Sequence, residues 1–287
     1  MVDDHSIHKF IKSINEIYSI PSVALKVVQQ ISDPEVRISD LSRVIQVDQA
    51  LTANILKVVN SGYFNFQDEI VTIKKAIVLM GLKLTKEITI SFAVKSLMKG
   101  MTEISNVDYK TIWMHSAYSA FFAKKLGDFF SQDGDTLYIS GLLHDLGLIV
   151  EILYDPEMVN QIFEEVNSSR QPFYIVEKKY WKNDHALVGD ELLKTWNISP
   201  VIRIPLKYHH QLENISPDDK NELEKIRIIH FANIIAHIYE NNSEFYRGLI
   251  TEDKLENLGI DEEKFWDMYD QFCDELKAEA EYISLLL

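Results

Sequence analysis

The stretch LYISGLLHDLGLIVEILY, residues 137–154, is apolar on nearly every side when it is wound into a helix. A helix of this kind is buried inside a protein, so we expect residues 137–154 to form the central helix of the fold. His144 and Asp145 interrupt the apolar run, and burying such a pair costs several kcal/mol unless it finds a partner. The pair therefore indicates a metal ion, a proton transfer or a satisfied hydrogen bond inside a helix bundle.

Helical spacing extends over most of the chain. Apolar residues recur every three or four positions in residues 39–62, 72–98, 108–130 and 261–282. We expect Ser39 and Asp48 to cap two helices in the first of these segments, and Thr72 to begin the next helix. The last segment places one set of apolar residues on a single face: Phe265, Met268, Tyr269, Phe272 and Leu276. Because Gly (10) and Pro (7) are scarce, the sequence predicts an all-α fold with long helices.

Composition restricts the partners and the compartment. The net charge of −15 repels phosphate backbones and anionic surfaces, so we expect neither nucleic acid nor a membrane as a partner. Cys273 is the single cysteine, which excludes an internal disulfide and a thiolate metal cluster. The acidic N-terminus lacks the apolar core of a signal peptide, and no apolar run approaches the roughly 18 residues of a membrane span. We therefore expect a cytoplasmic protein.

Histidines carry the strongest functional signal. Seven of the nine lie between residues 115 and 237, mostly in apolar helical context. Six groups are candidates for one shared site: His115, His144, Asp145, His185, His209 and His210. Imidazole and carboxylate ligands suit zinc, iron, manganese or nickel, and helix bundles hold such sites in their cores. A buried histidine is also often a hydrogen-bonded core residue, and we keep that interpretation for His230 and His237.

The order of these residues resembles a known superfamily. His115, the His144–Asp145 pair and a late polar residue at Asn233 resemble the HD superfamily of metal-dependent phosphohydrolases. The additional His185 and the pair His209–His210 resemble its HD-GYP branch, whose members hydrolyse cyclic di-GMP at a two- or three-metal centre. The resemblance adds Asn233 to the six candidate ligands. Asp184, next to His185, is expected to support that histidine rather than to bind the ion.

Longer segments resemble a more specific relative, the HDOD domain of bacterial signalling proteins. The resemblance is carried by residues 20–65, 70–88, 141–147, 184–199 and 207–213, and it spans roughly residues 15–245. It implies a helical N-terminal subdomain packed on an HD-like helical bundle. We place these subdomains at residues 1–104 and 105–250, with a C-terminal packing helix at 251–287, because the polar stretch GMTEISNVD (100–108) offers the best boundary.

The chain departs from the HD-GYP pattern at three positions. Leu148 stands where the motif HDIGK has its lysine, no GYP stretch follows His209–His210, and Asn233 replaces the closing aspartate. Asp145 is then the one charged ligand, at −1, against the +4 of two divalent ions. Like charges about 4 Å apart repel by several kcal/mol at an effective dielectric constant near 20, so one ion is easier to hold than two.

Two functions follow from these observations. The first is a regulatory signalling protein, with a protein partner, whose pocket binds a metal or a phosphate-containing ligand without efficient catalysis. An anion held by protonated histidines is a further form of this hypothesis. The second is an active metal-dependent phosphohydrolase or cyclic-dinucleotide phosphodiesterase, in which the metal activates water. The phosphohydrolase requires a divalent transition metal, and the regulatory protein can hold one: iron, manganese, nickel or zinc, in one or two copies.

Overall fold

The described part of the computed structural model comprises residues 26, 29, 36–98, 108–212, 220–279 and 283. Within these ranges the chain forms α-helices and no strand, which confirms the all-α prediction. The helices are α3 (Ile38–Val47), α4 (Gln49–Val59), α5 (Ile73–Met98), α6 (Tyr109–Phe129), α7 (Gly134–Leu143), α8 (Leu146–Tyr154), α9 (Pro156–Ser169), α10 (Phe173–Tyr180), α11 (His185–Thr195), α12 (Pro200–Lys207), α13 (Lys220–Asn241), α14 (Glu244–Gly248), α15 (Glu252–Leu258) and α16 (Glu262–Ala278).

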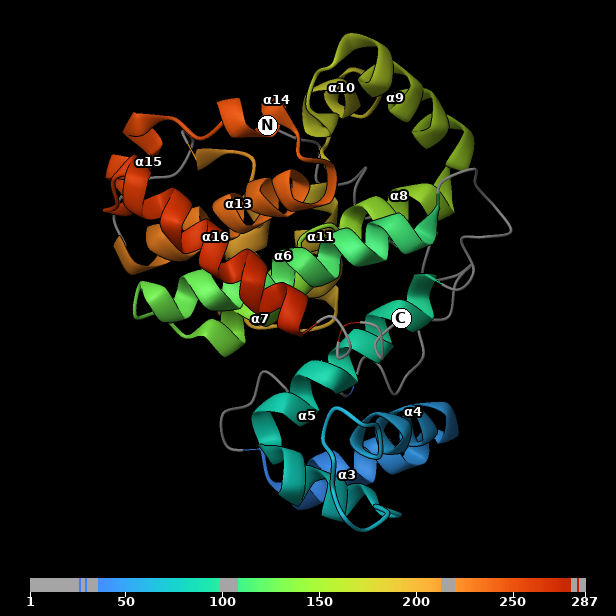
Figure 1. The fold of residues 1–287 in the computed structure, drawn as a ribbon. Helices are drawn as coiled ribbons and strands as arrows, with labels where there is room; N and C mark the ends of the chain where they lie inside the picture. The colour runs from blue at the N-terminus through green and yellow to red at the C-terminus, as the bar shows by residue number, and fades with distance from the viewer. Residues whose placement is uncertain are drawn as a thin grey trace.

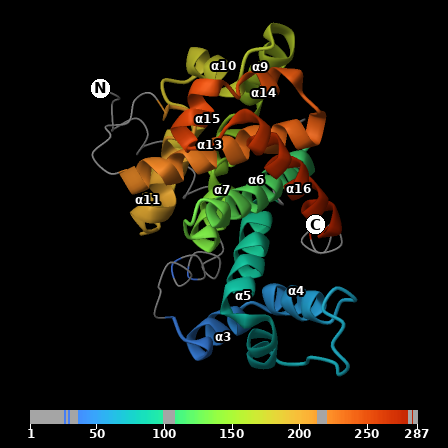
Figure 2. The ribbon, with the colours of Figure 1, turned by 60° about the vertical axis from the view of Figure 1, so that its left-hand side comes forward.

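Helices α3, α4 and the first part of α5 form a small N-terminal lobe below the larger helical lobe (Figures 1 and 2). Asp48 caps α4 as predicted, accepting a hydrogen bond from the backbone N–H of Leu51 at 2.9 Å. The cap predicted at Ser39 is wrong, because α3 begins at Ile38 and Arg37, two residues before Ser39, occupies the cap position. The buried faces of α3 and α4 (Leu41, Ile45, Ile55 and Val59) make the lobe's core.

Gly81 divides α5 into two segments. Its φ of 81° lies in the left-handed region, which glycine enters without a steric penalty. The first segment packs with α3 and α4, and the second runs from the small lobe up to the large one, where it contacts α7 (Figure 1). One glycine therefore converts the single predicted helix of residues 72–98 into the connection between two lobes.

The large lobe is built around α6, α7 and α13, which pack against one another, with α8, α11 and α12 beside them. Helices α9 and α10 project at the top, while α14–α16 cover another side (Figure 1). Helix α16 packs on α6 and buries the predicted apolar face, including Phe265 and Phe272. This arrangement leaves the junction of α7 and α8 deep inside the lobe.

The predicted central helix is interrupted at the histidine–aspartate pair. Helix α7 ends at Leu143 and α8 begins at Leu146, so His144 and Asp145 occupy the turn between two helices. Residues 134–154 are long and apolar enough to cross a membrane by composition alone, but 89% of the apolar window is buried inside the structure. Protein therefore already covers this apolar surface, and a cytoplasmic location stays a prediction.

Two glycines beside the pair allow helices to approach closely. A Cβ atom on Gly147 would overlap the carbonyl oxygen of His185 and lie 2.7 Å from the backbone N of Gly189, so α8 and α11 meet backbone to backbone. A Cβ atom on Gly141 would lie 2.8 Å from the carbonyl oxygen of Ser119 on α6. These contacts bring the histidines of α6 and α11 to the α7–α8 turn.

Candidate metal centre

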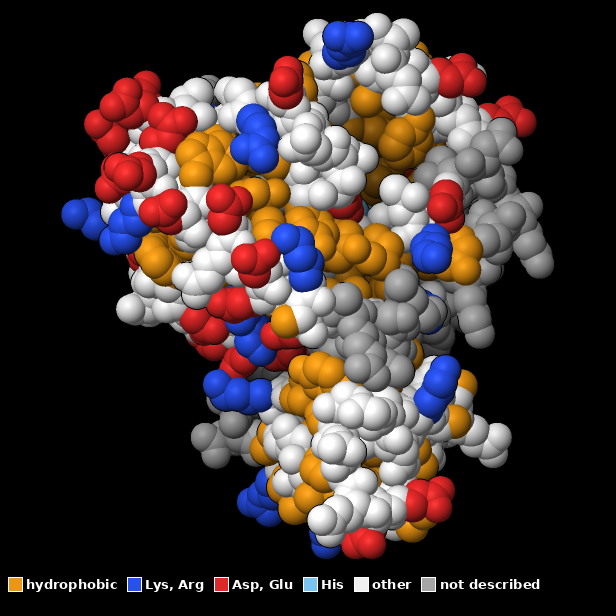
Figure 3. All heavy atoms as spheres, viewed as in Figure 1, with side chains coloured by type: hydrophobic (Ala, Val, Ile, Leu, Met, Phe, Trp, Pro, Cys, Tyr) orange, Lys and Arg blue, Asp and Glu red, His pale blue; other side chains and the backbone are white. Residues whose placement is uncertain are grey.

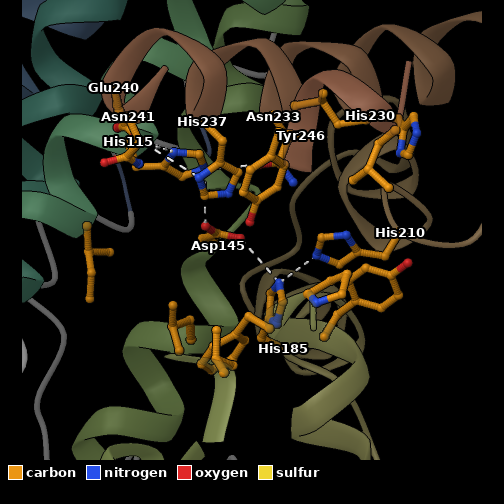
Figure 4. Close-up of a pocket in the computed structure, with 18 of the residues that line it drawn as sticks. His115, Asp145, His185, His210, His230, Asn233, His237, Glu240, Asn241 and Tyr246 are labelled. Atoms are coloured by element: carbon orange, nitrogen blue, oxygen red, sulfur yellow. Dashed lines mark hydrogen bonds and ion pairs between the residues drawn. The ribbon is translucent and has the colours of Figure 1, made fainter. Parts of the chain in front are cut away.

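Asp145 lies at the centre of a buried histidine cluster (Figure 4). Its Oδ2 atom is 3.1 Å from Nε2 of His144 and 3.8 Å from Nε2 of His115. Its Oδ1 atom is 3.3 Å from Nε2 of His185 and 3.9 Å from Nε2 of His209. These residues come from α6, the α7–α8 turn, the first position of α11 and the turn after α12, so tertiary packing alone brings them together.

The other ring nitrogen of each of these four histidines has an acceptor. Nδ1 of His144 donates to the carbonyl of Gly141 at 2.8 Å, and Nδ1 of His209 donates to the carbonyl of Leu206. Nδ1 of His185 donates to Glu177 at 3.0 Å, and Nδ1 of His115 donates to Glu240 at 3.0 Å. Acceptors on Nδ1 leave the Nε2 lone pairs directed at Asp145, the arrangement found around protein-bound metal ions.

A divalent ion fits this geometry. The buried Nε2 atoms of His144 and His209 have no hydrogen-bond partner. The 3.1 Å approach of His144 to Asp145 is close enough for an ion pair but lacks hydrogen-bond geometry. Buried lone pairs facing a carboxylate are costly unless a cation or proton lies between them. The residues present therefore suit a metal of the imidazole-binding class.

The remaining predicted residues lie around the same point. Nε2 of His210 is 3.0 Å from Nε2 of His185, and the His210 ring stacks on Tyr174 with centroids 4.3 Å apart. The side-chain oxygen of Asn233 lies 3.0 Å from Nε2 of His115. Three groups have ligand atoms that all lie within 4.8 Å of one another: His115, His144 and Asp145; Asp145, His185, His209 and His210; and His115, His237 and Glu240.

Asp184 caps the start of α11. Its side chain accepts from the backbone N–H of Leu187 at 3.0 Å and from Gln211 at 2.8 Å, and it pairs with Lys178 at 3.1 Å. Because His185 is the next residue, these contacts fix the helix end that carries the histidine. A supporting role for Asp184 at the site stays a prediction.

Sequence reasoning missed the carboxylates behind the histidines. Glu177 lies on α10 and Glu240 on α13, and each orients one histidine. His237, interpreted from sequence as a core residue, instead lines a cavity and stacks between His115 (4.0 Å) and Tyr246 (4.1 Å). His237 and Glu240 could have been found from the sequence, because their spacing from Asn233 places all three residues on one face of the same helix.

The cluster shifts the pKa values of its members in opposite directions. Burial alone would raise the pKa of Asp145, but His144 and His185 hold it well below its usual range. Burial opposes protonation of His185, yet Glu177 and Asp145 raise its pKa well above the usual value. Burial and neighbouring histidines lower the pKa values of His209 and His210 well below the usual range. A buried set of mixed charge states is typical of a functional site.

His230, which the sequence suggested as a core residue, is hydrogen-bonded but also lines the cavity, as His237 does. Its Nδ1 atom donates to the backbone carbonyl of His209 at 2.7 Å. Burial lowers the pKa of His230 to about 4, so the ring is neutral at physiological pH. The bond helps to hold the turn that carries His209.

The cluster opens into a cavity of about 440 Å³, which Asp145, His115, His185 and His210 line together with apolar residues. Figure 3 shows a recess with hydrophobic walls below α9 and α10. The volume lies within the roughly 300–1,000 Å³ range of small-molecule sites. A ligand in this cavity can therefore reach the histidine cluster.

An all-helical fold with a His–Asp pair at a helix junction and further histidines converging on it defines an HD-type helical protein. The chain belongs to the HDOD domain family, whose sequence model matches residues 17–212. This match confirms the resemblance noted from the sequence.

Solved structures share the fold. An HDOD domain protein of unknown function from Geobacter sulfurreducens is 20% identical, with a TM-score of 0.73 over 99% of this chain and 97% of that one. A Shewanella amazonensis SB2B protein, provisionally described as a phosphohydrolase, is 17% identical, with a TM-score of 0.70 over 94% of each chain.

A relative was also found by sequence. An uncharacterized protein of Treponema pallidum (strain Nichols) is 26% identical over 237 residues, which cover 81% of this chain and 44% of that relative's length.

Proposed function

We propose that this chain is a regulatory HDOD module whose HD-like site binds one or two divalent transition-metal ions and a phosphate-containing or other anionic ligand, without efficient catalysis. The observation that supports the proposal is the convergence of four imidazole Nε2 atoms on Asp145, each oriented by an acceptor on Nδ1. Iron, manganese, nickel and zinc all suit these ligands. The regulatory role, exerted through a protein partner, extends the signalling character of HDOD proteins to this chain.

The ligands divide into two ion positions that share Asp145. His115 and His144 would hold one ion, and His185, His209 and His210 would hold the other. When bound, such an ion supplies Lewis-acid polarisation of an oxygen ligand. The charge argument from sequence counted Asp145 alone, whereas Glu177 and Glu240 add two carboxylates directly behind the histidines. The electrostatic cost of binding a second ion is therefore lower than the charge argument from sequence suggested.

The cavity wall supports binding rather than hydrolysis. Leu148, at the position of the HD-GYP lysine, lines the cavity and presents an apolar side chain next to Asp145. Among the described lining residues Lys254 is the one lysine or arginine, and its ammonium group donates to the carbonyl of Leu249 at 2.9 Å. Phosphoryl-transfer sites stabilise developing charge with cationic clamps, and this cavity is poor in them.

A metal-dependent phosphohydrolase is the second candidate. The observation in its favour is the carboxylate of Asp145, whose two oxygens face different histidine groups, as in two-metal hydrolytic sites. The description of the Shewanella amazonensis relative as a phosphohydrolase points the same way.

Elemental mass spectrometry of protein purified without added metal or a histidine tag tests the proposal. We expect one or two equivalents of transition metal in the wild type and none in His144→Ala/Asp145→Ala. The control is Asp267→Ala/Asp270→Ala, which removes two exposed carboxylates of α16 and should keep the metal. Absence of metal from the wild type, including after incubation with iron, manganese or zinc, would overturn the metal site.

Phosphodiesterase assays then separate the two candidates. Metal-loaded protein is incubated with cyclic di-GMP and with bis-p-nitrophenyl phosphate, with and without a chelator. We expect no chelator-sensitive turnover. Turnover that a chelator abolishes and that His144→Ala/Asp145→Ala lacks would instead establish the phosphohydrolase.

A further inference from the structure

The cavity has two chemically different ends. One end is the histidine cluster around Asp145, and the other is an apolar wall contributed by four helices. The apolar residues that matter here are Ile112 of α6, Leu148 of α8, Phe163 and Val166 of α9, and Phe173 of α10. Figure 3 shows a recess lined by hydrophobic side chains between the projecting α9–α10 pair and the body of the lobe.

The apolar wall begins directly at the candidate ligands. The Phe173 ring meets the His185 ring edge to face, with centroids 5.7 Å apart. Phe163 continues the wall, with its centroid 4.9 Å from that of Phe173. Leu148 lies three residues after Asp145, on the first turn of α8. A ligand whose anionic group reaches His185 therefore lies next to the apolar wall that begins at Phe173.

The distribution of charge restricts the ligand further. A cyclic dinucleotide carries two phosphodiesters, and proteins usually neutralise such groups with arginine or lysine. Among the described lining residues the cavity offers Lys254 alone. A single anionic group placed at the histidine cluster, joined to an apolar body, matches both ends of the cavity.

We propose that the cavity binds an amphiphile with a single anionic head group, a carboxylate or a phosphate, at the Asp145–histidine cluster and an alkyl chain along Phe173, Phe163 and Val166. The head-group half rests on the proposed metal site, because the negative charge of Asp145 repels an anion unless a cation lies between them. Binding of the alkyl chain depends on the apolar wall alone. The head-group part and the alkyl-chain part of the proposal can therefore be tested separately.

Titration calorimetry with a series of chain lengths tests the proposal. Metal-loaded protein is titrated with hexanoate, octanoate and decanoate, with octyl and decyl phosphate, and with inorganic phosphate. Burial of each methylene group should tighten binding about fourfold until the cavity is full. Comparison of the carboxylate and phosphate series identifies the preferred head group, and inorganic phosphate should bind more weakly than decyl phosphate by at least about 100-fold.

A pair of tryptophan variants locates the chain. Val166→Trp fills the apolar end from α9, where Val166 is half-buried, and should weaken decanoate binding at least about tenfold while leaving the metal content unchanged. Val201→Trp is the matched control, because Val201 is 48% exposed on α12 and does not line this cavity. It should bind decanoate as the wild type does.

Three results would overturn the inference: affinity independent of chain length, equal effects of the two tryptophan variants, or cyclic di-GMP binding that exceeds decanoate binding and survives Val166→Trp. Decanol, which has the chain without the charge, separates this failure from failure of the metal site. Decanol binding that Val166→Trp weakens, in protein that holds no metal, would support the apolar end while the proposed metal site fails. Conversely, protein that holds metal but whose affinity for the ligands does not depend on chain length would support the metal site, while the amphiphile proposal fails.

Discussion

The Nδ1 atom of His185 lies 3.0 and 3.1 Å from the two carboxylate oxygens of Glu177, and both side chains are buried. Glu177 also accepts the backbone N–H of His185 at 2.9 Å. Burial and the neighbouring Glu177 raise the pKa of Glu151 well above its usual range, which favours a neutral Glu151 carboxyl group beside Glu177. A buried chain from Glu151 on α8 through Glu177 on α10 thus fixes the imidazole that faces Asp145.

Replacing Glu177 with Gln should weaken metal binding. Carboxylates behind metal-bound histidines raise the basicity of the ligand, and their loss typically lowers metal affinity about 10–100-fold. Competition with a fluorescent chelator measures this affinity. The exposed Glu164→Gln on α9 is the control and should match the wild type. Equal affinities for the two variants would show that Glu177 has no influence on the ion.

Replacing Glu151 with Gln should stabilise the metal-free protein at neutral pH. The pKa of Glu151 is raised in the folded state, so its contribution to stability is fully present below the unfolded value near 4.5 and is lost as the pH rises through the folded value. Glutamine keeps a neutral donor toward Glu177 and removes this loss. Urea unfolding between pH 4.5 and 8 measures the effect, and the exposed Glu157→Gln is the control.

A flatter pH profile in Glu151→Gln than in Glu157→Gln is the expected result. Identical pH profiles for the two variants would contradict a protonated Glu151 in the folded state. A fall in stability at every pH would indicate that glutamine does not fit the buried position.

Gly147→Ala should destabilise the fold severely. The added Cβ would overlap the carbonyl oxygen of His185 and approach the backbone N of Gly189, and neither backbone can move aside easily. Overpacking typically costs about 1–3 kcal/mol, and a backbone clash should reach or exceed the upper value. Gly248→Ala, where a Cβ meets nothing within 4 Å, should leave the free energy of unfolding nearly unchanged. Similar urea midpoints for both variants would refute the close approach of α8 and α11.

Leu148→Lys should add a lysine beside Asp145, in a cavity whose described lining holds Lys254 as its one lysine or arginine. Leu148 lines the cavity beside Asp145, so a lysine there can reach an anion held at the cluster. A charge-assisted hydrogen bond contributes about 1.5–3 kcal/mol, which corresponds to roughly 10–100-fold tighter binding of inorganic phosphate to the metal-loaded protein. Leu153→Lys, on the same helix but outside the cavity lining, is the control. No difference in phosphate affinity between the two would mean that residue 148 does not face the bound anion.

The sequence by itself determined the helices and the chemistry of the candidate ligands. Helical spacing and the cap at Asp48 are local properties, because they depend on residues within one or two turns. The identities of His115, Asp145 and His185 likewise restrict the ions they can bind, wherever the chain places them. Helical spacing did not predict the breaks at Gly81 and at His144–Asp145, because the apolar pattern continues through both positions.

Only the tertiary structure decided which side chains meet. His115, Asp145 and His185 are separated by tens of residues, and their convergence depends on the packing of α6, α8 and α11 at glycine contacts that spacing cannot reveal. Glu177 carries no sequence signal, since its role follows from where α10 lies relative to α11. The apolar end of the cavity is also a product of packing, because residues from several helices share a wall only after those helices have assembled.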